Sequence, residues 1–536
     1  MLGIVMLTVA IMSMTTTAMP TALPTTTMTG RRSMTDKVAS GGGAGVAVSL
    51  SQKGLTYIKD VGIELILAEL KTISVPTISG SAGTPVGHVD YTLSNIAITN
   101  LALPDSILQL KPGTGIQVGV SSAVCDVSLN WHYREHSWPH ISDHGSASVD
   151  VSKTTISVTV AIGEASGRPT VAVDASEVDI GSFHIKVHGG ASWLYNWLVG
   201  LFKGSVKSSV QSSLKSAIVD AINKQAEEAL ATLPIKEKVD KYSSVNYAML
   251  APPSITATQF SSVHLGQFLS NSPAPPGPWA PVKLPTTVDA ADEINLVFSE
   301  DVALSAGYVY FKAGALHTTV NELPSWSPVS LNTTSMRFLL PALYKAYPDM
   351  KVEFELAANA TPNAAISPDG ATCDVLGNVA VYVLPAGQPR IYAFTLGLHL
   401  FGTGKVAVSA NNITAQVSYV GCNLSLANTT APIGNFNVQL LDALVNLAVS
   451  KGLVPWINKV LGVGFPIPVV SGITLSSIEV VYGTGYVGLA SDFTYAPPTL
   501  GDAGSAAAAA YNAAMAARPG DAGDLIKASL PVRIDE

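Results

Sequence analysis

The sequence is poor in charge. Only 13% of its 536 residues are Asp, Glu, Lys or Arg, about half the share of a typical globular domain. Thirty basic residues face 38 acidic ones, which gives a net charge of −8. Nucleic-acid binding needs clustered Lys and Arg to neutralise phosphates, so this balance argues against a nucleic-acid partner. It also argues against strong electrostatic attachment to anionic membranes.

Long hydrophobic runs are missing as well. Apolar residues make up 47% of the chain, yet no stretch of about 20 uninterrupted apolar residues occurs, as a membrane span requires. The apolar residues are scattered in short runs and alternating patterns, which is typical of a water-soluble protein with a large buried surface. A chain of this length is expected to form two or more domains.

Cysteine is scarce. Cys125, Cys373 and Cys422 cannot all pair internally, which excludes a disulfide scaffold and leaves a Cys373–Cys422 bond open. Residues 1–22 combine an apolar run of about twelve residues with small and polar ones, and predict a signal peptide without a positive n-region. N-x-S/T sequons support a secreted glycoprotein; they lie at Asn332, Asn359, Asn412, Asn423 and Asn428.

Catalytic motifs are not recognisable either. No G-x-S-x-G elbow occurs, and the GTGKV segment at Gly402 lacks the spacing and the Ser/Thr of a phosphate-binding loop. We therefore predict a protein that is not an enzyme, with no cofactor and no metal. An extracellular lipid hydrolase with dispersed catalytic residues is the enzymatic alternative.

The chain does contain three segments with helical spacing of apolar residues. The first runs from Ser49 to Pro76 and has an apolar stripe too wide for an ordinary surface helix. A long helix is predicted over 192–233, with a ladder at every fourth position: Leu198, Phe202, Val206, Val210, Leu214, Ile218 and Ile222. Another is predicted over 438–461, carrying Leu440, Leu444, Leu447, Val454, Ile457 and Leu461.

Alternating segments surround these helices and predict antiparallel strands with one apolar face. Examples are YTLSNIAITNLAL and SASVDVSKTTISVTVAIG in the first half, and KVEFELAANA and IYAFTLGLHLF in the second. A proline-rich linker, SNSPAPPGPWAPVKLP, separates the halves. A shorter helix, DVALSAGYVYFKAGAL, follows it. The order helix, strands, long helix, strands occurs twice, so we infer a duplicated architecture.

Several of these segments resemble one known family. SQKGLTYIKDVG, GRPTVAV with GASWLYNWLVGLF, VNYAMLAPP, FLLPALYKAYPDMKVEFELAANATP and FNVQLLDALVNLAV followed by GFPIP occur in the order seen in that family. It comprises bactericidal/permeability-increasing protein, lipopolysaccharide-binding protein and cholesteryl ester transfer protein. The resemblance covers roughly residues 46–495, and WHYREHSWPHISDHGSASV with GGASWLYNWL looks closer to plant and protist members.

The resemblance implies an α+β boomerang of two similar barrels. Each barrel is a highly twisted antiparallel sheet wrapped round a long helix, and a central antiparallel sheet joins them. The implied division is a signal peptide at 1–22, a linker at 23–45, an N-terminal barrel at 46–245, central-sheet strands and the linker at 246–285, a C-terminal barrel at 286–495 whose residues 469–495 return to the central sheet, and a disordered Ala/Gly-rich tail at 496–536.

Each implied barrel holds an apolar tunnel for phospholipid acyl chains. The residues expected to line the N-terminal tunnel are Leu55, Ile58, Ile66, Leu70, Leu198, Phe202, Val206, Val210 and Leu214. Those expected in the C-terminal tunnel are Leu440, Leu444, Leu447, Val454, Ile457 and Leu461. The alternative is that these residues simply fill a core.

Two departures from the family pattern matter. In the family, a disulfide ties the first sheet to its long helix. The corresponding positions here fall near Ser176 and Val219, so the bridge is absent and the first barrel is expected to rely on packing alone. The basic tip of endotoxin-binding members is also missing, because Arg134 is the one fixed positive charge there and Glu135 and Asp143 oppose it.

The predicted tip is a hairpin, since Pro139 and the flanking strand pattern oppose a helix. Its candidate membrane and headgroup residues are Trp131, His132, Arg134, His136 and Trp138. Three interpretations stay open for its histidines, which also include His140 and His144: a metal site with Glu135 or Asp143, a headgroup contact switched on by mild acid, and a plain polar hairpin.

The predicted function is extracellular binding, and transfer, of phospholipid or a related amphiphile, with transient contact at a membrane surface. The alternatives are an innate-defence protein that recognises lipopolysaccharide and a structural or adhesive glycoprotein with closed barrels.

Overall fold

The computed structural model describes most of the chain between residues 43 and 495. The described ranges are 43–60, 77–84, 87–136, 138–189, 211–212, 215–216, 235–273, 284–285, 291–323, 329–409, 412–429, 441–442, 445–446, 449–463, 465–466 and 473–495, with the single residues 196, 219, 223, 275, 277, 287, 289 and 327. The predicted signal peptide, most of the 23–45 linker and the 496–536 tail lie outside them.

A six-stranded antiparallel sheet occupies the middle of the molecule. Its strand order is β11-β12-β1-β14-β23-β22, so it joins the start, the centre and the end of the described chain. The bounds are Val46–Ser51 for β1, Ser254–Ile255 for β11, Gln259–His264 for β12, Ile294–Ser299 for β14, Ile473–Gly483 for β22 and Tyr486–Tyr495 for β23. A three-stranded sheet lies beside it, made of β9 (Lys236–Lys238), β10 (Ser243–Asn246) and β13 (Gln267–Ser270).

The start of the chain corrects one prediction. The opening helix begins at Gln52, three residues later than expected, because Ser49–Ser51 belong to β1. The Ser51 hydroxyl accepts a hydrogen bond from the Gly54 amide at 3.2 Å and so caps the first turn. Strand β1 pairs with β12 on one side and β14 on the other, which buries its backbone.

A seven-stranded antiparallel sheet forms the N-terminal half. The main order is β2-β3-β5-β6-β7, with β4 paired to β5 and β8 paired to β6. The bounds are Ile78–Thr84 for β2, Gly87–Ala102 for β3, Asp105–Lys111 for β4, Gly115–Glu135 for β5, Ser142–Ala165 for β6, Arg168–Asp179 for β7 and Ser182–His188 for β8.

Bulges bend this sheet. The pairing of β5 with β6 shifts register near Ser122, and Ser122 and Lys153 both have a positive φ, at 57° and 56°. An extra residue of this kind increases local twist and curls the strands. Gly181, between β7 and β8, lies against the Lys153 carbonyl, where a Cβ would come within 2.5 Å. The absence of a side chain there lets β8 follow the bend.

The C-terminal half repeats the arrangement. Its sheet has the order β15-β16-β18-β19-β20-β21, with β17 paired to β18. The bounds are His317–Val320 for β15, Lys351–Ala358 for β16, Asn363–Ser367 for β17, Gly370–Leu384 for β18, Ile391–Ser409 for β19, Asn412–Thr429 for β20 and Phe465–Pro466 for β21; the helical segments are α7 (Asp301–Lys312), α8 (Pro341–Ala346), the π-helical η3 (Val449–Leu453) and α10 (Val454–Val463).

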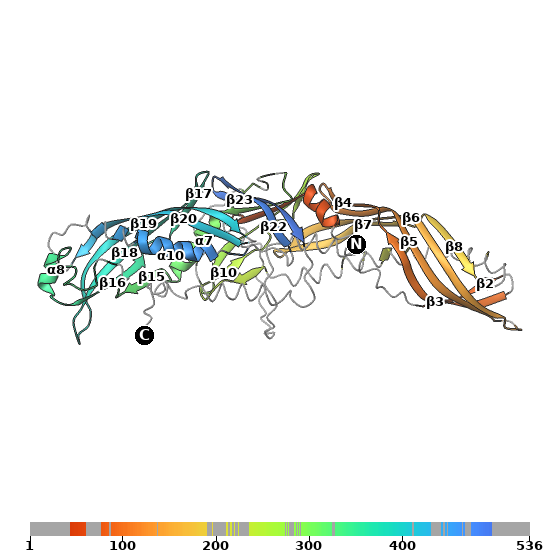
Figure 1. The fold of residues 1–536 in the computed structure, drawn as a ribbon, viewed down its shortest axis with the longest axis horizontal. Coiled ribbons are helices and arrows are strands. Elements are labelled where there is room, and N and C mark those ends of the chain that lie inside the picture. The colour runs from red at the N-terminus through yellow and green to blue at the C-terminus, as the bar shows by residue number, and fades with distance from the viewer. Residues whose placement is uncertain are drawn as a thin grey trace.

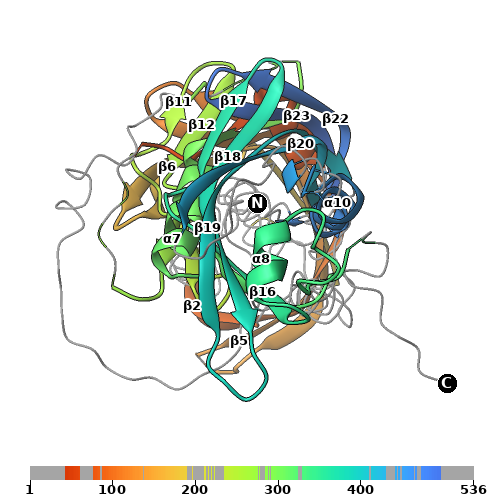
Figure 2. The same ribbon diagram turned by 90° about the vertical axis from the view of Figure 1, so that its left-hand side faces the viewer.

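The described elements form an elongated, gently bent molecule (Figure 1). The two seven-stranded sheets lie toward opposite ends and the six-stranded sheet lies between them. Seen along the long axis, β18, β19 and β20 curve round one side and α10 lies close to β20 (Figure 2). The predicted class of curled antiparallel sheets is therefore confirmed, as is the helix after the linker, which is α7. Closed barrels with a continuous long helix remain a prediction.

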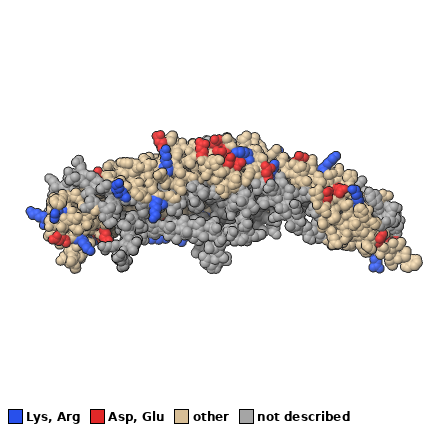
Figure 3. All heavy atoms as spheres, viewed as in Figure 1, with Lys and Arg blue, Asp and Glu red and all other residues tan. Residues whose placement is uncertain are grey.

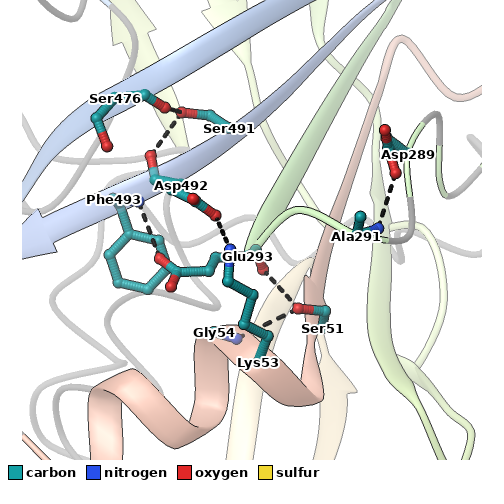
Figure 4. Close-up of polar contacts among 10 residues, drawn as sticks. All are labelled: Ser51, Lys53, Gly54, Asp289, Ala291, Glu293, Ser476, Ser491, Asp492 and Phe493. Atoms are coloured by element: carbon teal, nitrogen blue, oxygen red, sulfur yellow. Dashed lines mark hydrogen bonds and ion pairs between the residues drawn. The ribbon is translucent and has the colours of Figure 1, made fainter.

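A polar cluster anchors the opening helix to the central sheet (Figure 4). Lys53 forms an ion pair with Asp492 of β23 at 2.5 Å, and a Glu293 carboxylate oxygen accepts the Phe493 amide at 3.0 Å. Burial, followed by the nearby Asp492 and Asp292 charges, raises the pKa of Glu293 above its usual range. Acidic side chains also gather at mid-length on the face shown in Figure 3. The helix start is thereby held to two segments that are distant in sequence, to Glu293 through the Ser51 hydroxyl and to β23 through Lys53.

Candidate functional site

The apolar face of the N-terminal sheet, here called its inner face, carries two separate buried clusters. One lies at the junction with the central sheet and includes Leu110, Val118 and Val158. The other lies toward the outer end and includes Leu129, Val149 and Ile185. Alternating residues of β5 and β6 contribute to both clusters, as the strand period requires, and β8 contributes to the outer one.

Between these clusters the inner face is only half-buried. Cys125 of β5 lies opposite Val151 of β6, and Val151 lies opposite Phe183 of β8. All three side chains are partly exposed, although they share a face with fully buried neighbours. This row, here called the N-terminal row, is an apolar surface that the described chain leaves incompletely covered. It also coincides with the bend at Ser122 and Lys153.

The C-terminal sheet has a similar stretch. Its inner face is buried around Val381, Phe394 and Leu396. Farther along the same strands, Val375 of β18 lies opposite Leu400 of β19, and both are half-buried. Cys373 shares that face of β18 and is exposed. We call Cys373, Val375 and Leu400 the C-terminal row.

The predicted tunnel residues fall into three groups. Leu55 and Ile58 are 0% exposed and pack into the junction cluster. They present no surface to a ligand, so we assign them to the core instead of a tunnel wall. Val454, at the start of α10, is half-buried. The other predicted positions have side chains outside the described part of the structure: Ile66, Leu70, Leu198, Phe202, Val206, Val210, Leu214, Leu440, Leu444, Leu447, Ile457 and Leu461.

Polar side chains from the first predicted long helix bind the outer edge of β7. The Asn223 side-chain oxygen accepts the Val173 amide at 2.9 Å. The Gln211 amide donates to the Val178 carbonyl and to the Asp179 carboxylate, each at 3.2 Å. These contacts lie on either side of Val219. The expectation that packing alone holds this half together is therefore wrong, because edge hydrogen bonds supplement the packing where the family's disulfide would lie.

The second predicted long helix makes the same kind of contact with the edge of β20. Asn446 accepts the Cys422 amide at 2.9 Å and donates to the Cys422 carbonyl at 2.6 Å. Asn458 does the same for Val417, at 2.7 Å and 3.1 Å. A side-chain amide thus replaces the missing neighbouring strand, which satisfies an edge that would otherwise be open. The helix is held along the rim of the sheet, beside the C-terminal row.

The tip of the N-terminal half is the turn between β5 and β6, as predicted. Trp131 is 3% exposed, stacks on Tyr133 and donates its indole N–H to the Ser146 carbonyl at 3.0 Å. Gly145 lies opposite Trp131, and the lack of a side chain there makes room for the indole. Trp138, by contrast, is 87% exposed. Of the two predicted anchors, Trp138 alone presents its ring to solvent, together with the half-exposed Ile141.

The tip histidines lie on the outer face of the same strands. His132 and His144 are direct neighbours across β5 and β6, and both are exposed beside Arg134. His136 contacts the Asp90 carboxylate at 2.8 Å, which lowers the pKa of that carboxyl. Strand β8 adds His188 on the same face, opposite Ser146, whereas Lys186 and His184 lie farther from the turn, opposite Ser148 and Asp150. These residues were not predicted, because they join this face through the pairing of β8 with β6.

Within the described ranges, no group of three or more His, Cys, Asp or Glu side chains is arranged to hold a metal ion. The same ranges contain no helix long and apolar enough to cross a membrane. Cys125, Cys373 and Cys422 are all free thiols. Cys373 and Cys422 lie on β18 and β20 with β19 between them, so the pairing left open above does not form.

The predicted glycosylation sites differ in accessibility. Asn359 and Asn423 are exposed. Asn332 is half-buried and its side-chain oxygen accepts the Ser335 amide at 2.7 Å. The side chains of Asn412 and Asn428 lie outside the described part of the structure.

Comparison with solved structures identifies the fold. The crystal structure of lipopolysaccharide binding protein matches with a TM-score of 0.57 and 24% sequence identity, and the match covers 85% of this chain and 100% of that one. The two proteins therefore share a fold along nearly the whole described length.

Comparison of the sequence identifies the family. The N-terminal domain model of the LBP / BPI / CETP family matches residues 54–233, and its C-terminal domain model matches residues 237–495. The chain therefore belongs to the LBP / BPI / CETP family, as the resemblance predicted. Bactericidal permeability-increasing protein of Sebastes schlegelii is 29% identical over 84% of this chain and 95% of its own length. A putative BPI/LBP family protein of Arabidopsis thaliana is 27% identical over 84% and 92%. The two sequence identities are nearly equal, so the similarity to the plant relative does not set it apart from the Sebastes schlegelii relative.

Proposed function

We propose that this protein is an extracellular carrier that binds a phospholipid or related amphiphile and transfers it between membranes. The observation that carries the proposal is the incompletely buried apolar row on the inner face of each curled sheet, next to side chains that are fully buried. A filled core would bury these side chains as completely as their neighbours. Hydrocarbon chains laid along the rows would complete that burial without any covalent step.

The energetics favour acyl chains as the ligand. Burial of hydrocarbon contributes about 0.8 kcal/mol per CH₂. A bilayer buries the same hydrocarbon with the same gain in free energy. The net affinity for the protein therefore depends on what the protein adds beyond the bilayer, namely an apolar surface that is already ordered. The half-buried residues of the N-terminal row contribute no formal charge, so we place the headgroup outside, in water. Binding of the tails, and not catalysis, is the role that these surfaces support.

The long helices are proposed to form the second wall of each site. Asn223 and Asn446 hold them against sheet edges through side-chain hydrogen bonds. Such a contact can open locally and re-form, which gives a lipid a route between helix and sheet. The predicted lining residues that lie outside the described ranges remain part of this proposal, from Leu198 to Leu214 and from Leu440 to Leu461.

Docking is proposed to begin at the β5–β6 tip. Trp138 and Ile141 supply exposed apolar surface, and indole rings favour the membrane interface. Arg134 and the exposed histidines of the outer face are proposed to contact anionic headgroups. Vesicle flotation at pH 5 and pH 7.5 tests the histidine contribution.

Lipopolysaccharide is the second candidate ligand, on the strength of relatives so named. The lipopolysaccharide-binding protein of Homo sapiens is 25% identical over 85% of this chain. The exposed residues of the tip lack the basic cluster that lipid A phosphates would need, since Arg134 is the fixed cation on this hairpin. We therefore rank a phospholipid first and treat lipopolysaccharide as a competitor in the test.

The native cysteines test the proposal. Cys125 and Cys373 belong to the two rows; Cys125 is half-buried, and burial raises the pKa of its thiol. The protein is stripped of lipid, incubated with or without phosphatidylcholine vesicles, and alkylated with a maleimide while each site is followed by peptide mass spectrometry. Lipid uptake is expected to slow alkylation of Cys125 and Cys373 several-fold. Lipid extracted from the purified protein would identify the natural ligand.

A matched control comes from the neighbouring residue. Thr372 lies on the opposite, outward face of β18 and is exposed. A thiol introduced by Thr372→Cys is expected to react at the same rate with and without lipid. Unchanged alkylation at both row cysteines, with no lipid taken up, would instead support closed barrels and an adhesive role. Protection by lipopolysaccharide but not by phospholipid would favour the defence protein.

A further inference from the structure

The outer face of the C-terminal sheet carries aromatic and apolar side chains that the buried clusters do not use. Phe401 of β19 lies 5.2 Å from the His399 ring and 6.0 Å from the Tyr419 ring, measured between centroids. Tyr419 is 55% exposed and Leu376 is 48% exposed. We call Leu376, His399, Phe401 and Tyr419 the outer aromatic patch. These side chains lie on the face opposite the C-terminal row, so the proposed lipid does not cover them.

A glycine makes room for two rings of the patch. Gly421 is the strand neighbour of Phe401 and is buried. A Cβ built on Gly421 would collide with the Phe401 ring and lie 2.7 Å from the Tyr419 hydroxyl. The strand thus has no side chain where the two rings meet, and the planes of these rings are tilted by 50° to each other. Tyr419 and Leu376 leave apolar surface exposed there.

A glycosylation sequon lies directly beside this surface. Asn423 is the register partner of His399, which in turn is the partner of Leu376. Asn423 is two residues from Gly421 on the same face, which places it about 7–8 Å diagonally from Phe401. Both Asn423 and the sequon hydroxyl residue Ser425 are exposed. A sugar attached to Asn423 would begin within reach of the rings.

We propose that Asn423 carries an N-linked glycan whose first N-acetylglucosamine packs on the outer aromatic patch. The C–H groups of a pyranose ring form an apolar face that suits an aromatic ring, and its hydroxyls remain in water. The His399 imidazole, held by Asp374 at 2.9 Å, stands at the Asn423 side of the patch. The glycan would shield Phe401, Tyr419 and Leu376 from solvent and from contact with other proteins. This inference rests on the proposed secretion, but it is independent of the lipid ligand.

The other accessible sequon provides a matched control. Asn359 is exposed, and its side-chain amide donates to Asn378 at 3.2 Å instead of facing a ring. The Asn359 backbone amide donates to the Leu376 carbonyl at 3.0 Å, so a glycan at Asn359 would begin beside Leu376, at the edge of the patch away from Asn423 and with no aromatic ring as its direct strand neighbour. It is therefore expected to leave stability unchanged.

The test uses the full chain produced through the secretory pathway of a eukaryotic host. Glycopeptide mass spectrometry is expected to find a glycan on Asn423. Trimming to a single N-acetylglucosamine should keep the melting temperature, whereas Asn423→Gln should lower the C-terminal transition by about 2–4 °C. In a Phe401→Ser background the Asn423→Gln change should have no further effect, and Asn359→Gln should have none in either background.

Two results would overturn the proposal. One is an unmodified Asn423 in protein that has passed through the secretory pathway. The other is an equal loss of stability from Asn423→Gln with and without Phe401, which would show that the sugar does not use the ring. Neither result bears on lipid uptake, which the cysteine alkylation experiment tests separately.

Discussion

Asn446 offers the sharpest test of how the second helix is held to its sheet. The perturbation is Asn446→Leu, which keeps the branched shape and the number of side-chain heavy atoms and removes both hydrogen-bonding groups. The variant leaves the Cys422 amide and carbonyl without their partners at the edge of β20. Cys422 is 1% exposed, so water does not readily replace the lost bonds.

The expected magnitude follows from those two groups. A buried backbone group that loses its partner costs about 1–3 kcal/mol, so the loss of two partners is expected to destabilise the local structure by roughly 2–6 kcal/mol. At 1.4 kcal/mol for each factor of ten, this corresponds to hydrogen exchange that is roughly 30- to 20,000-fold faster at the Cys422 amide. Hydrogen exchange is the suitable assay because it reports local opening in a chain of several units.

Asn458→Leu is the matched comparison. It removes the same pair of bonds from Val417, which is only half-buried. Water can partly replace these two hydrogen bonds at Val417, so the loss of local stability is expected to be smaller than in Asn446→Leu. The Cys422 thiol provides a second readout. Burial raises its pKa to about 11, and its alkylation should accelerate in Asn446→Leu. Unchanged exchange and alkylation at Cys422 would refute the idea that Asn446 holds the helix to the strand.

Two further predictions concern a buried carboxyl and the tip. Burial, with the Glu300 charge as a lesser cause, raises the pKa of Asp301 to about 6 from its usual 3.8, and its Oδ2 has no hydrogen-bond partner among the described residues. The folded-state pKa is the higher one, so ionisation weakens the fold as pH rises from about 4 to 6, by at most about 3 kcal/mol. Asp301→Asn should therefore raise the urea midpoint at pH 7.5 and leave it unchanged at pH 4; an equal effect at both values would contradict this reasoning. At the tip, Trp138→Ser should weaken flotation with anionic vesicles roughly 10- to 100-fold without changing stability, whereas Trp131→Phe should lower stability by removing the bond to Ser146. Equal binding of the parent protein at pH 5 and pH 7.5 would remove the histidine contribution.

Local patterns predicted much of the fold correctly. Alternation of apolar and polar residues identified long strands such as β3, β6 and β19, because one face of each is buried and the period of a strand is two. The helix after the linker was predicted from its sequence and is α7. The hairpin at the tip followed from Pro139. The family was identifiable because several local stretches of the sequence resemble it and occur in the order seen in the family.

Other features depend on pairings between distant parts of the chain. The sequence at Ser49 and Ser51 is compatible with either a helix or a strand. Pairing with β12 and β14 makes this segment part of the strand β1. Trp131 was predicted to contact a membrane at the tip, but it is buried, and its burial depends on the space left by Gly145 across the hairpin. His188 joins the outer face near the tip only because β8 pairs with β6.

The sequence by itself determined which faces are apolar, where the chain turns and to which family it belongs, because these depend on neighbours a few positions away. The tertiary structure decided which apolar residues are covered. Leu55 and Ile58 are sealed in the junction cluster, whereas Val151 and Leu400, with the same chemistry, stay half-buried. Burial depends on what packs opposite a side chain, and in this molecule bulges and sheet edges set that, through contacts between residues far apart in the chain.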